Sequence, residues 1–233
     1  MTTFVTDWHE LWEHKGDAPV EKYDLETLIS LVGLDSDLGA MTPDQFRALA
    51  AVVEKTLGLR EGSRVLDVGC GAGALLWCLR DTGAELFGID YSPTLVEHAR
   101  AALPEARIEV AEATDIPFKV DAIVCHRVFQ YFPDYEYARR VLRAFRRAAP
   151  VALILDVPDL ATRTEAEIAR IAGGAMSGKH LYYPRPFFRG TVWGSRVHGY
   201  GYAPYRFNAL LSGRRSRRGR RLPELPALGG VTR

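Results

Sequence analysis

The sequence predicts an α/β fold: a doubly wound, mostly parallel sheet with helices before it. Between about residues 60 and 160, short apolar runs alternate with segments of helical periodicity, as in a sheet whose parallel strands are joined by helices. The apolar run at residues 65–68 ends in glycines at 69, 71 and 73, and a helix-forming run follows directly. A chain of 233 residues is long enough for one such domain with a modest elaboration.

Three helical patterns precede the first strand. They lie at about residues 7–14, 24–33 and 42–58. Trp8 and Trp12 share one face of the first pattern, and Thr42, followed by proline, is the predicted N-cap of the third. We expect the third helix to pack on the sheet and residues 1–40 to form a helical lid. Plain packing is the alternative role for the two tryptophans.

Residues 41–160 are the predicted core of the domain. Its strands are predicted at residues 65–68, 85–89, 107–111, 121–125 and 151–155. Its helices after the first strand are predicted at residues 74–80, 92–103 and 135–148. The last of these helices carries five arginines, which we interpret as a solvent-exposed face.

The C-terminal third divides into two parts. Residues 161–212 are predicted to complete the same domain, with a helix at 164–172, a mobile connection at 175–179 and an aromatic segment at 180–189. From residue 213 arginine, glycine and proline replace any periodicity, so residues 213–233 are predicted to be a disordered basic tail.

The charge of the chain is unevenly distributed. The net charge is +1, but six arginines lie within residues 214–221, and residues 1–213 are net acidic. The charge of the predicted folded part of the chain therefore gives no reason to expect that it binds polyanions such as nucleic acids.

The cysteines and the apolar runs bear on compartment and metal binding. Cys70, Cys78 and Cys125 form no C-x-x-C pair, so neither a disulfide framework nor a zinc site is indicated, and we expect no metal. The sequence shows no basic stretch followed by an apolar core at its start, and no apolar run of membrane-spanning length. We therefore expect a soluble, cytoplasmic protein.

The glycine turn at residues 69–73 predicts a nucleotide-sized seat at a helix N-terminus. Read as G-x-G-x-x-A, it fits a dinucleotide fingerprint, with Asp90 as the acid about 20 residues on. Asp67, two residues before the first glycine, separates two cofactor classes, because a carboxylate there repels a pyrophosphate. A cationic amino-acid ligand is tolerated far better. S-adenosylmethionine carries a sulfonium and an ammonium group and no phosphate.

Four motifs in order make the chain similar to the class I S-adenosylmethionine-dependent methyltransferases. They are Val65-Leu-Asp-Val-Gly-Cys-Gly-Ala-Gly73, Gly88-Ile-Asp90-Tyr-Ser, Glu112-Ala-Thr-Asp115-Ile-Pro-Phe and Val120-Asp-Ala-Ile-Val-Cys125. The resemblance covers about residues 60–160. It implies a Rossmann-like fold of seven strands with the last antiparallel, and residues 196–200 and 205–211 resemble the last two strands of that fold.

The resemblance also implies a binding site for S-adenosylmethionine and its product S-adenosylhomocysteine. The residues implied to bind them are Asp67, Gly69, Cys70, Gly71, Gly73, Asp90, Tyr91, Ala113, Thr114, Asp115 and His126. Asp90 would accept from both ribose hydroxyls, because each carboxylate oxygen can take one donor. Asp67 would hold the amino group and Asp115 the adenine amino group. Loop capping is the alternative role for Asp90 and Asp115.

The substrate side rests on fewer residues. His126 follows the fourth predicted strand, so it should enter the cleft and could act as general base, with His180 as the second candidate. A structural histidine fits position 126 equally well, and methyl transfer can rest on positioning alone. The expected acceptor pocket consists of Trp8, Trp12, Tyr182, Tyr183 and Arg185. The alternative is that these aromatic side chains pack against the edge of the sheet.

The leading hypothesis is an O- or N-methyltransferase for a small organic acceptor, of a kind found in specialised metabolism. The alternatives are an RNA methyltransferase assisted by the basic tail, a nicotinamide-dependent oxidoreductase, and a protein that binds the cofactor without turnover. Cys125-His-Arg-Val replaces the Asn-Pro-Pro-aromatic sequence of many base methyltransferases, which argues against nucleic acid as a partner. Asp67 and the lack of a Tyr-x-x-x-Lys pair argue against the oxidoreductase. The oligomeric state stays open.

Overall fold

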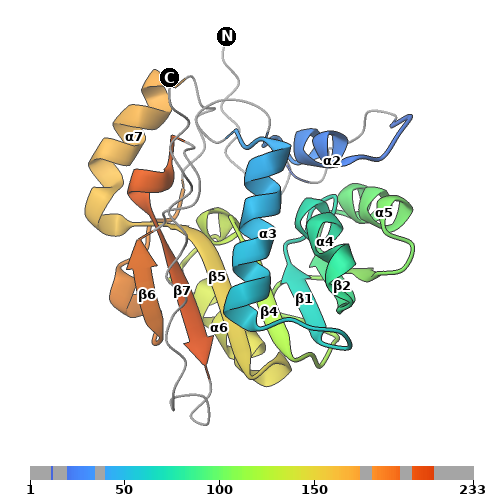
Figure 1. Cartoon of the computed structure of the whole chain (residues 1–233). Helices are drawn as coiled ribbons and strands as arrows, with labels where there is room; N and C mark the ends of the chain where they lie inside the picture. The colour runs from blue at the N-terminus through green and yellow to red at the C-terminus, as the bar shows by residue number, and fades with distance from the viewer. Residues whose placement is uncertain (1–11, 13–19, 35–39, 174–179, 195–200, 213–233) are drawn as a thin grey trace.

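A seven-stranded sheet forms the centre of the protein, in the order β3-β2-β1-β4-β5-β7-β6 (Figure 1). The computed structural model describes residue 12 and residues 20–34, 40–173, 180–194 and 201–212. The strands are β1 (Arg64–Val68), β2 (Glu85–Asp90), β3 (Arg107–Val110), β4 (Ala122–His126), β5 (Val151–Pro158), β6 (Thr191–Gly194) and β7 (Arg206–Ser212). Strand β7 runs antiparallel to β5 and β6, and the other pairs in the sheet are parallel. This confirms the predicted doubly wound, mostly parallel sheet with an antiparallel last strand.

Helices cover both faces of the sheet. They are α2 (Leu25–Leu31), α3 (Pro43–Leu57), α4 (Ala74–Leu79), α5 (Pro93–Ala102), α6 (Tyr135–Ala148) and α7 (Arg163–Ala172). Short 3-10 turns lie at η2 (Arg80–Thr82), η3 (Phe129–Tyr131), η4 (Leu160–Thr162), η5 (Arg185–Phe187) and η6 (Ala203–Tyr205). Figure 1 shows α3 and α4 on the near face and α6 behind the sheet.

The two faces have separate cores because successive strand residues point to opposite sides. Val65 of β1 packs with the buried side chains of α2 to α5, while the next residue, Leu66, packs with those of α6. Most central strand residues are buried, as expected for a parallel sheet that is covered on both sides.

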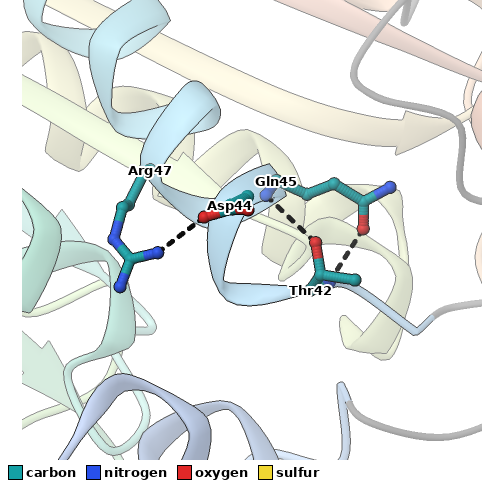
Figure 2. Close-up of polar contacts among 4 residues, drawn as sticks. All are labelled: Thr42, Asp44, Gln45 and Arg47. Carbon is teal, nitrogen blue, oxygen red and sulfur yellow. Dashed lines mark hydrogen bonds and ion pairs between the residues drawn. The ribbon is translucent and has the colours of Figure 1, made fainter. Parts of the chain in front are cut away.

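Helix α3 begins with a capping box. Gln45 donates its backbone N–H to the Thr42 hydroxyl oxygen at 3.3 Å, and Thr42 donates its backbone N–H to the Gln45 side chain at 2.8 Å (Figure 2). Met41 precedes the cap and Phe46 follows it, and both are buried, which is the pattern of a hydrophobic staple. The start of α3, and with it the position of Phe46, is therefore specified within one turn.

The sixth strand lies earlier in the chain than the sequence predicts. The predicted strand at 196–200 lies outside the described residues, as do Trp8, the connection at 175–179 and the tail at 213–233. The structure instead pairs Thr191 with Leu210 and Gly194 with Phe207. An edge strand of four residues that is only half-buried shows little alternation, so its pattern is hard to detect in the sequence.

Candidate cofactor and acceptor site

A cavity of about 700 Å³ opens at the carboxyl ends of the central parallel strands. Strands β2 and β4 lie on opposite sides of β1, so the order of the strands switches there, which is where ligands bind in sheets of this kind. The acidic and basic side chains that line the cavity lie at or just after the carboxyl ends of β1 to β4: Asp67, Asp90, Glu112, His126 and Arg127. No group of three or more possible metal ligands occurs among the described residues.

The glycine turn is shaped by backbone conformation and by close neighbours. Gly69 and Gly71 have φ angles of 75° and 53°, in the left-handed region that glycine adopts most easily. A Cβ at Gly69 would come within 2.3 Å of the Val128 side chain, and one at Gly71 within 2.6 Å of Val32. Val32, which follows α2, therefore lies directly on the turn.

Asp90 links the turn to the start of α5. One of its oxygens accepts the N–H of Gly71 at 2.9 Å, and the other accepts the N–H of Ser92 at 3.0 Å. The carboxyl is buried, and this burial is the main cause that raises its pKa above the ordinary value. Asp90 thus caps a loop and borders the cavity at the same time. The two roles considered from the sequence are compatible.

Asp67 is a buried carboxyl with unmet hydrogen-bonding capacity. It belongs to β1 and is 3% exposed, and its Oδ1 makes no hydrogen bond among the described residues. Burial and then the neighbouring Asp90 raise its pKa from 3.8 to about 8. Because it lines the cavity, a cation or a hydrogen-bond donor bound there would satisfy it.

The pKa of Asp67 makes stability depend on pH. Since the folded protein holds this proton more tightly than the unfolded chain, its free energy of unfolding should fall as the pH rises from about 4 to about 8. Asp67→Asn removes the charge and should stabilise the ligand-free protein by about 1–3 kcal/mol at pH 8. The difference should shrink at pH 5. Urea unfolding at both pH values measures it.

A matched control for this measurement is Asp81→Asn. The Asp81 side chain is 89% exposed, so its replacement should give no pH-dependent gain. An equal gain from Asp67→Asn at pH 5 and pH 8 would contradict the assignment.

Glu112 lines the cavity, whereas Asp115, which is predicted to hold the adenine amino group, does not. Glu112 comes two residues after β3 and lines the cavity, and the Tyr137 hydroxyl of α6 donates to its Oε2 at 2.6 Å. Asp115 is exposed and does not line the cavity, and its carboxylate accepts from the Thr114 hydroxyl at 2.9 Å. Glu112 could have been recognised in the sequence as a candidate site residue, because it comes just after the end of a strand, as Asp90 comes at the end of one.

Most of the predicted cofactor residues come together. The cavity is lined by Asp67, Gly69, Cys70, Gly71, Asp90, Tyr91, Ala113 and His126. The lining does not include Gly73, Thr114 and Asp115. Gly73 is instead the N-cap of α4, which begins at the next residue. The roles of these residues toward a cofactor stay predictions.

The two candidate bases occupy different surroundings. His126 ends β4 and lines the cavity, with its ring edge-on to Phe46 at 6.1 Å between centroids. His180 lies behind the cavity wall, edge-on to Tyr131 at 5.7 Å, and does not line the cavity. Burial and then nearby arginines lower the pKa of His180 well below 6.5, so it is neutral at neutral pH.

Of the predicted acceptor residues that the structure describes, one lines the cavity and three do not. Trp12 lines the cavity and contacts Tyr131 edge-on at 5.3 Å. Tyr182, Tyr183 and Arg185 do not line it. Tyr183 is fully buried and donates its hydroxyl to the Phe129 carbonyl at 2.9 Å, and Arg185 donates to Asp159 at 2.8 Å. These contacts pack the segment against the sheet, which is the alternative considered above.

The aromatic wall of the cavity is formed by four side chains that were not predicted from the sequence to belong to the site. Its side chains are Phe46, Tyr131, Phe132 and Tyr137. Two of them lie in the connection between β4 and α6, which enters the cavity because it starts at the carboxyl end of a central strand. The position of this connection after a central strand could therefore have identified Tyr131 and Phe132 as candidate site residues from the sequence.

Comparison with known proteins adds independent information. A family model described as "Methyltransferase domain" matches residues 65–150. The ubiquinone biosynthesis O-methyltransferase of Alkalilimnicola ehrlichii is 37% identical over 91 residues, which are 35% of this chain and 36% of that protein. The enzyme of the same name from Xanthomonas campestris is 33% identical over 110 residues, 44% of each chain. The chain thus spans less than half the length of the curated relatives it matches.

A solved structure supports the fold over a longer range. The magnesium protoporphyrin IX methyltransferase of Synechocystis PCC 6803, crystallised with bound SAH, aligns with a TM-score of 0.52 at 16% identity. The alignment covers 88% of this chain and 93% of that one. At this identity the likeness concerns the fold alone.

Proposed function

We propose that this chain, a member of the class I S-adenosylmethionine-dependent methyltransferases, binds S-adenosylmethionine and methylates an O or N atom of a small organic acceptor. The observation that carries the proposal is the pair of buried carboxyls beside the glycine turn, one of which has an oxygen without a partner among the described residues. This arrangement suits a cationic amino-acid cofactor and disfavours a pyrophosphate.

Each acid has a part of the cofactor to hold. Asp67 would receive the ammonium group, Asp90 the ribose hydroxyls and Glu112 the adenine amino group. The carboxylates suit these groups because all of them donate hydrogen bonds. S-adenosylmethionine supplies, when bound, a methyl group on a sulfonium, which is already activated for displacement. The predicted lid, with Val32 above the turn, would enclose this half of the cavity.

The acceptor side then needs orientation more than chemical activation. The aromatic wall would hold a flat or apolar molecule with its nucleophilic atom toward His126. As the new O–C or N–C bond forms and the S–C bond breaks, His126 would take the proton of the nucleophile. The printed names of the curated relatives, O-methyltransferases of ubiquinone biosynthesis, support a small-molecule acceptor.

Calorimetry tests the cofactor assignment. The protein should bind S-adenosylmethionine and S-adenosylhomocysteine and should not bind NAD. Incorporation of tritiated methyl groups into a panel of small phenols, carboxylic acids and amines then tests transfer. NAD binding with no binding of S-adenosylhomocysteine would refute the proposal.

The adenine assignment has its own paired test. Glu112→Gln should weaken S-adenosylhomocysteine binding about 5- to 10-fold, because the hydrogen bond keeps an acceptor oxygen but loses the charge of that acceptor. Asp115→Asn should leave the affinity within about twofold, since Asp115 does not line the cavity. Calorimetry on both variants decides between them. A larger loss from Asp115→Asn would restore the prediction made from the sequence.

A further inference from the structure

A hydrogen bond across the cavity wall joins Glu112 to Tyr137, two lining residues that lie 25 positions apart in the sequence. Glu112 belongs to the loop after β3, and Tyr137 lies in the first turn of α6. The distance of 2.6 Å from the Tyr137 hydroxyl to Glu112 Oε2 is in the short range of hydroxyl bonds to a carboxylate. This bond connects the aromatic wall of the cavity to the proposed adenine side.

The backbone around Glu112 is fixed, but the backbone does not set the direction of the side chain. Ala111 donates its N–H to the Asp90 carbonyl at 2.9 Å, and Asp115 donates its N–H to the Glu112 carbonyl at 2.9 Å. A glutamate side chain has three rotatable bonds beyond this backbone, and the torsion of its terminal carboxylate is only broadly restricted. The direction of the Glu112 carboxylate therefore depends on the side chains that contact it.

Tyr137 is held in place by contacts that do not involve Glu112. Its backbone N–H donates to the side chain of Asp134, the N-cap of α6, at 2.7 Å. Its ring lies 5.0 Å from the Phe132 ring between centroids, and the Arg140 guanidinium lies over it at 5.1 Å. A hydroxyl on a ring held in this way has a defined position, so it can fix the position of the group that accepts its proton.

The Tyr137 hydroxyl remains a donor at neutral and moderately alkaline pH. Burial and then the hydrogen bond to Glu112 raise the pKa of Tyr137 above its usual value of 10.0. The hydroxyl therefore keeps its proton, and the carboxylate is the accepting partner in this bond.

Tyr135, two residues earlier in the same helix, shows how a tyrosine contributes to packing here. Its hydroxyl donates to the Tyr182 carbonyl at 2.7 Å, and the residue does not line the cavity. A backbone carbonyl already has a fixed direction, so this bond ties one segment to another and orients no side chain. Tyr137 instead holds a rotatable carboxylate at the cavity wall.

We propose that Tyr137 is a positioning residue that directs the Glu112 carboxylate toward the 6-amino group of the cofactor adenine and so sets the preference for an amino-substituted purine. Each carboxylate oxygen can accept more than one donor, so the bond from Tyr137 leaves Glu112 able to accept another. A carboxylate that is oriented in advance loses less side-chain freedom when the cofactor binds. This inference rests on the proposed function and adds a selectivity determinant to its cofactor site.

The test uses two ligands that differ at one position. They are S-adenosylhomocysteine and its purine analogue, in which a hydrogen atom replaces the 6-amino group of the adenine. Calorimetry on the full chain should show that the parent protein binds S-adenosylhomocysteine at least tenfold more tightly than the analogue, because the analogue lacks the donor to Glu112.

Tyr137→Phe removes the hydroxyl and keeps the ring with its contacts to Phe132 and Arg140. This variant should bind S-adenosylhomocysteine about 3- to 10-fold more weakly than the parent protein and should keep its affinity for the analogue within about twofold. The ratio of the two dissociation constants therefore falls. A tyrosine that only stabilised α6 would affect both ligands equally, and binding of the analogue shows that the variant is folded.

Tyr135→Phe is the matched control, because it removes a hydroxyl with a similarly short hydrogen bond from the same helix, outside the cavity. It should leave the ratio within about twofold of the parent value. An unchanged ratio in Tyr137→Phe, or an equal fall in Tyr135→Phe, would overturn this inference and leave the proposed function standing. A parent protein that binds neither ligand would refute both.

Discussion

Asp90→Ala should weaken the binding of S-adenosylmethionine by about 2–4 kcal/mol, or roughly 30- to 1,000-fold. The carboxylate borders the cavity and would hold the ribose hydroxyls, so its loss removes one or two charge-assisted hydrogen bonds. Calorimetry with S-adenosylmethionine and S-adenosylhomocysteine measures the effect. Unchanged affinity in a folded variant would remove Asp90 from the binding site.

The design must separate binding from folding, because Asp90 also accepts the N–H groups of Gly71 and Ser92. Asp90→Asn keeps one side-chain oxygen as an acceptor and removes the charge, so it should fold more readily and still bind more weakly than the parent protein. Glu85→Ala is the control. It removes an exposed acid from the opposite end of β2 and should leave cofactor affinity unchanged.

His126→Ala should lower turnover by roughly 10²–10⁴-fold if the acceptor atom is a hydroxyl. A hydroxyl must lose its proton as the new bond forms, and His126 is the histidine that lines the cavity in the described part of the chain. The dissociation constant of S-adenosylhomocysteine should change little. Single-turnover methyl transfer and calorimetry on the same preparation separate the two effects.

A second histidine provides the control for this prediction. His98 of α5 does not line the cavity, and its Nδ1 lies 2.9 Å from the Tyr23 hydroxyl. His98→Gln keeps a side chain able to accept that hydroxyl and should retain the parent rate. If His126→Ala also retains the parent rate at every pH, no base is needed at this position.

The sequence carried most of the information about the sheet. Strands β1, β2 and β4 are buried on both faces, so each appears as an apolar run that local inspection detects. Asp67 and Asp90 could be recognised as candidate site residues in the same way, because they lie at or near the ends of such runs. Strand β6 could not, since a half-buried edge strand is positioned by its pairing with β7 rather than by its own composition.

The side chains on the proposed acceptor side of the cavity could not be predicted from the sequence, because their positions depend on contacts between segments that are far apart in the chain. Arg127 and Asp156 meet because β4 and β5 are neighbours and because both residues adopt left-handed backbone. Tyr183 has the composition of a pocket residue, but its bridge to Asp159 fixes its segment against the sheet. The motifs that resemble the family predict which residues bind the cofactor, whereas the path of each loop decides which side chains line the proposed acceptor side of the cavity.

The capping box of α3 also matters for the wall of the cavity, because Phe46 lies one turn into this helix. Contacts within residues 41–46 fix the start of the helix, and from that start Phe46 reaches the cavity, edge-on to His126. The side chains of α2 pack in the same core as Phe46, so both helices hold this part of the cavity wall. A substitution at Thr42 or Gln45 would therefore reach the cavity through Phe46, although neither residue lines it.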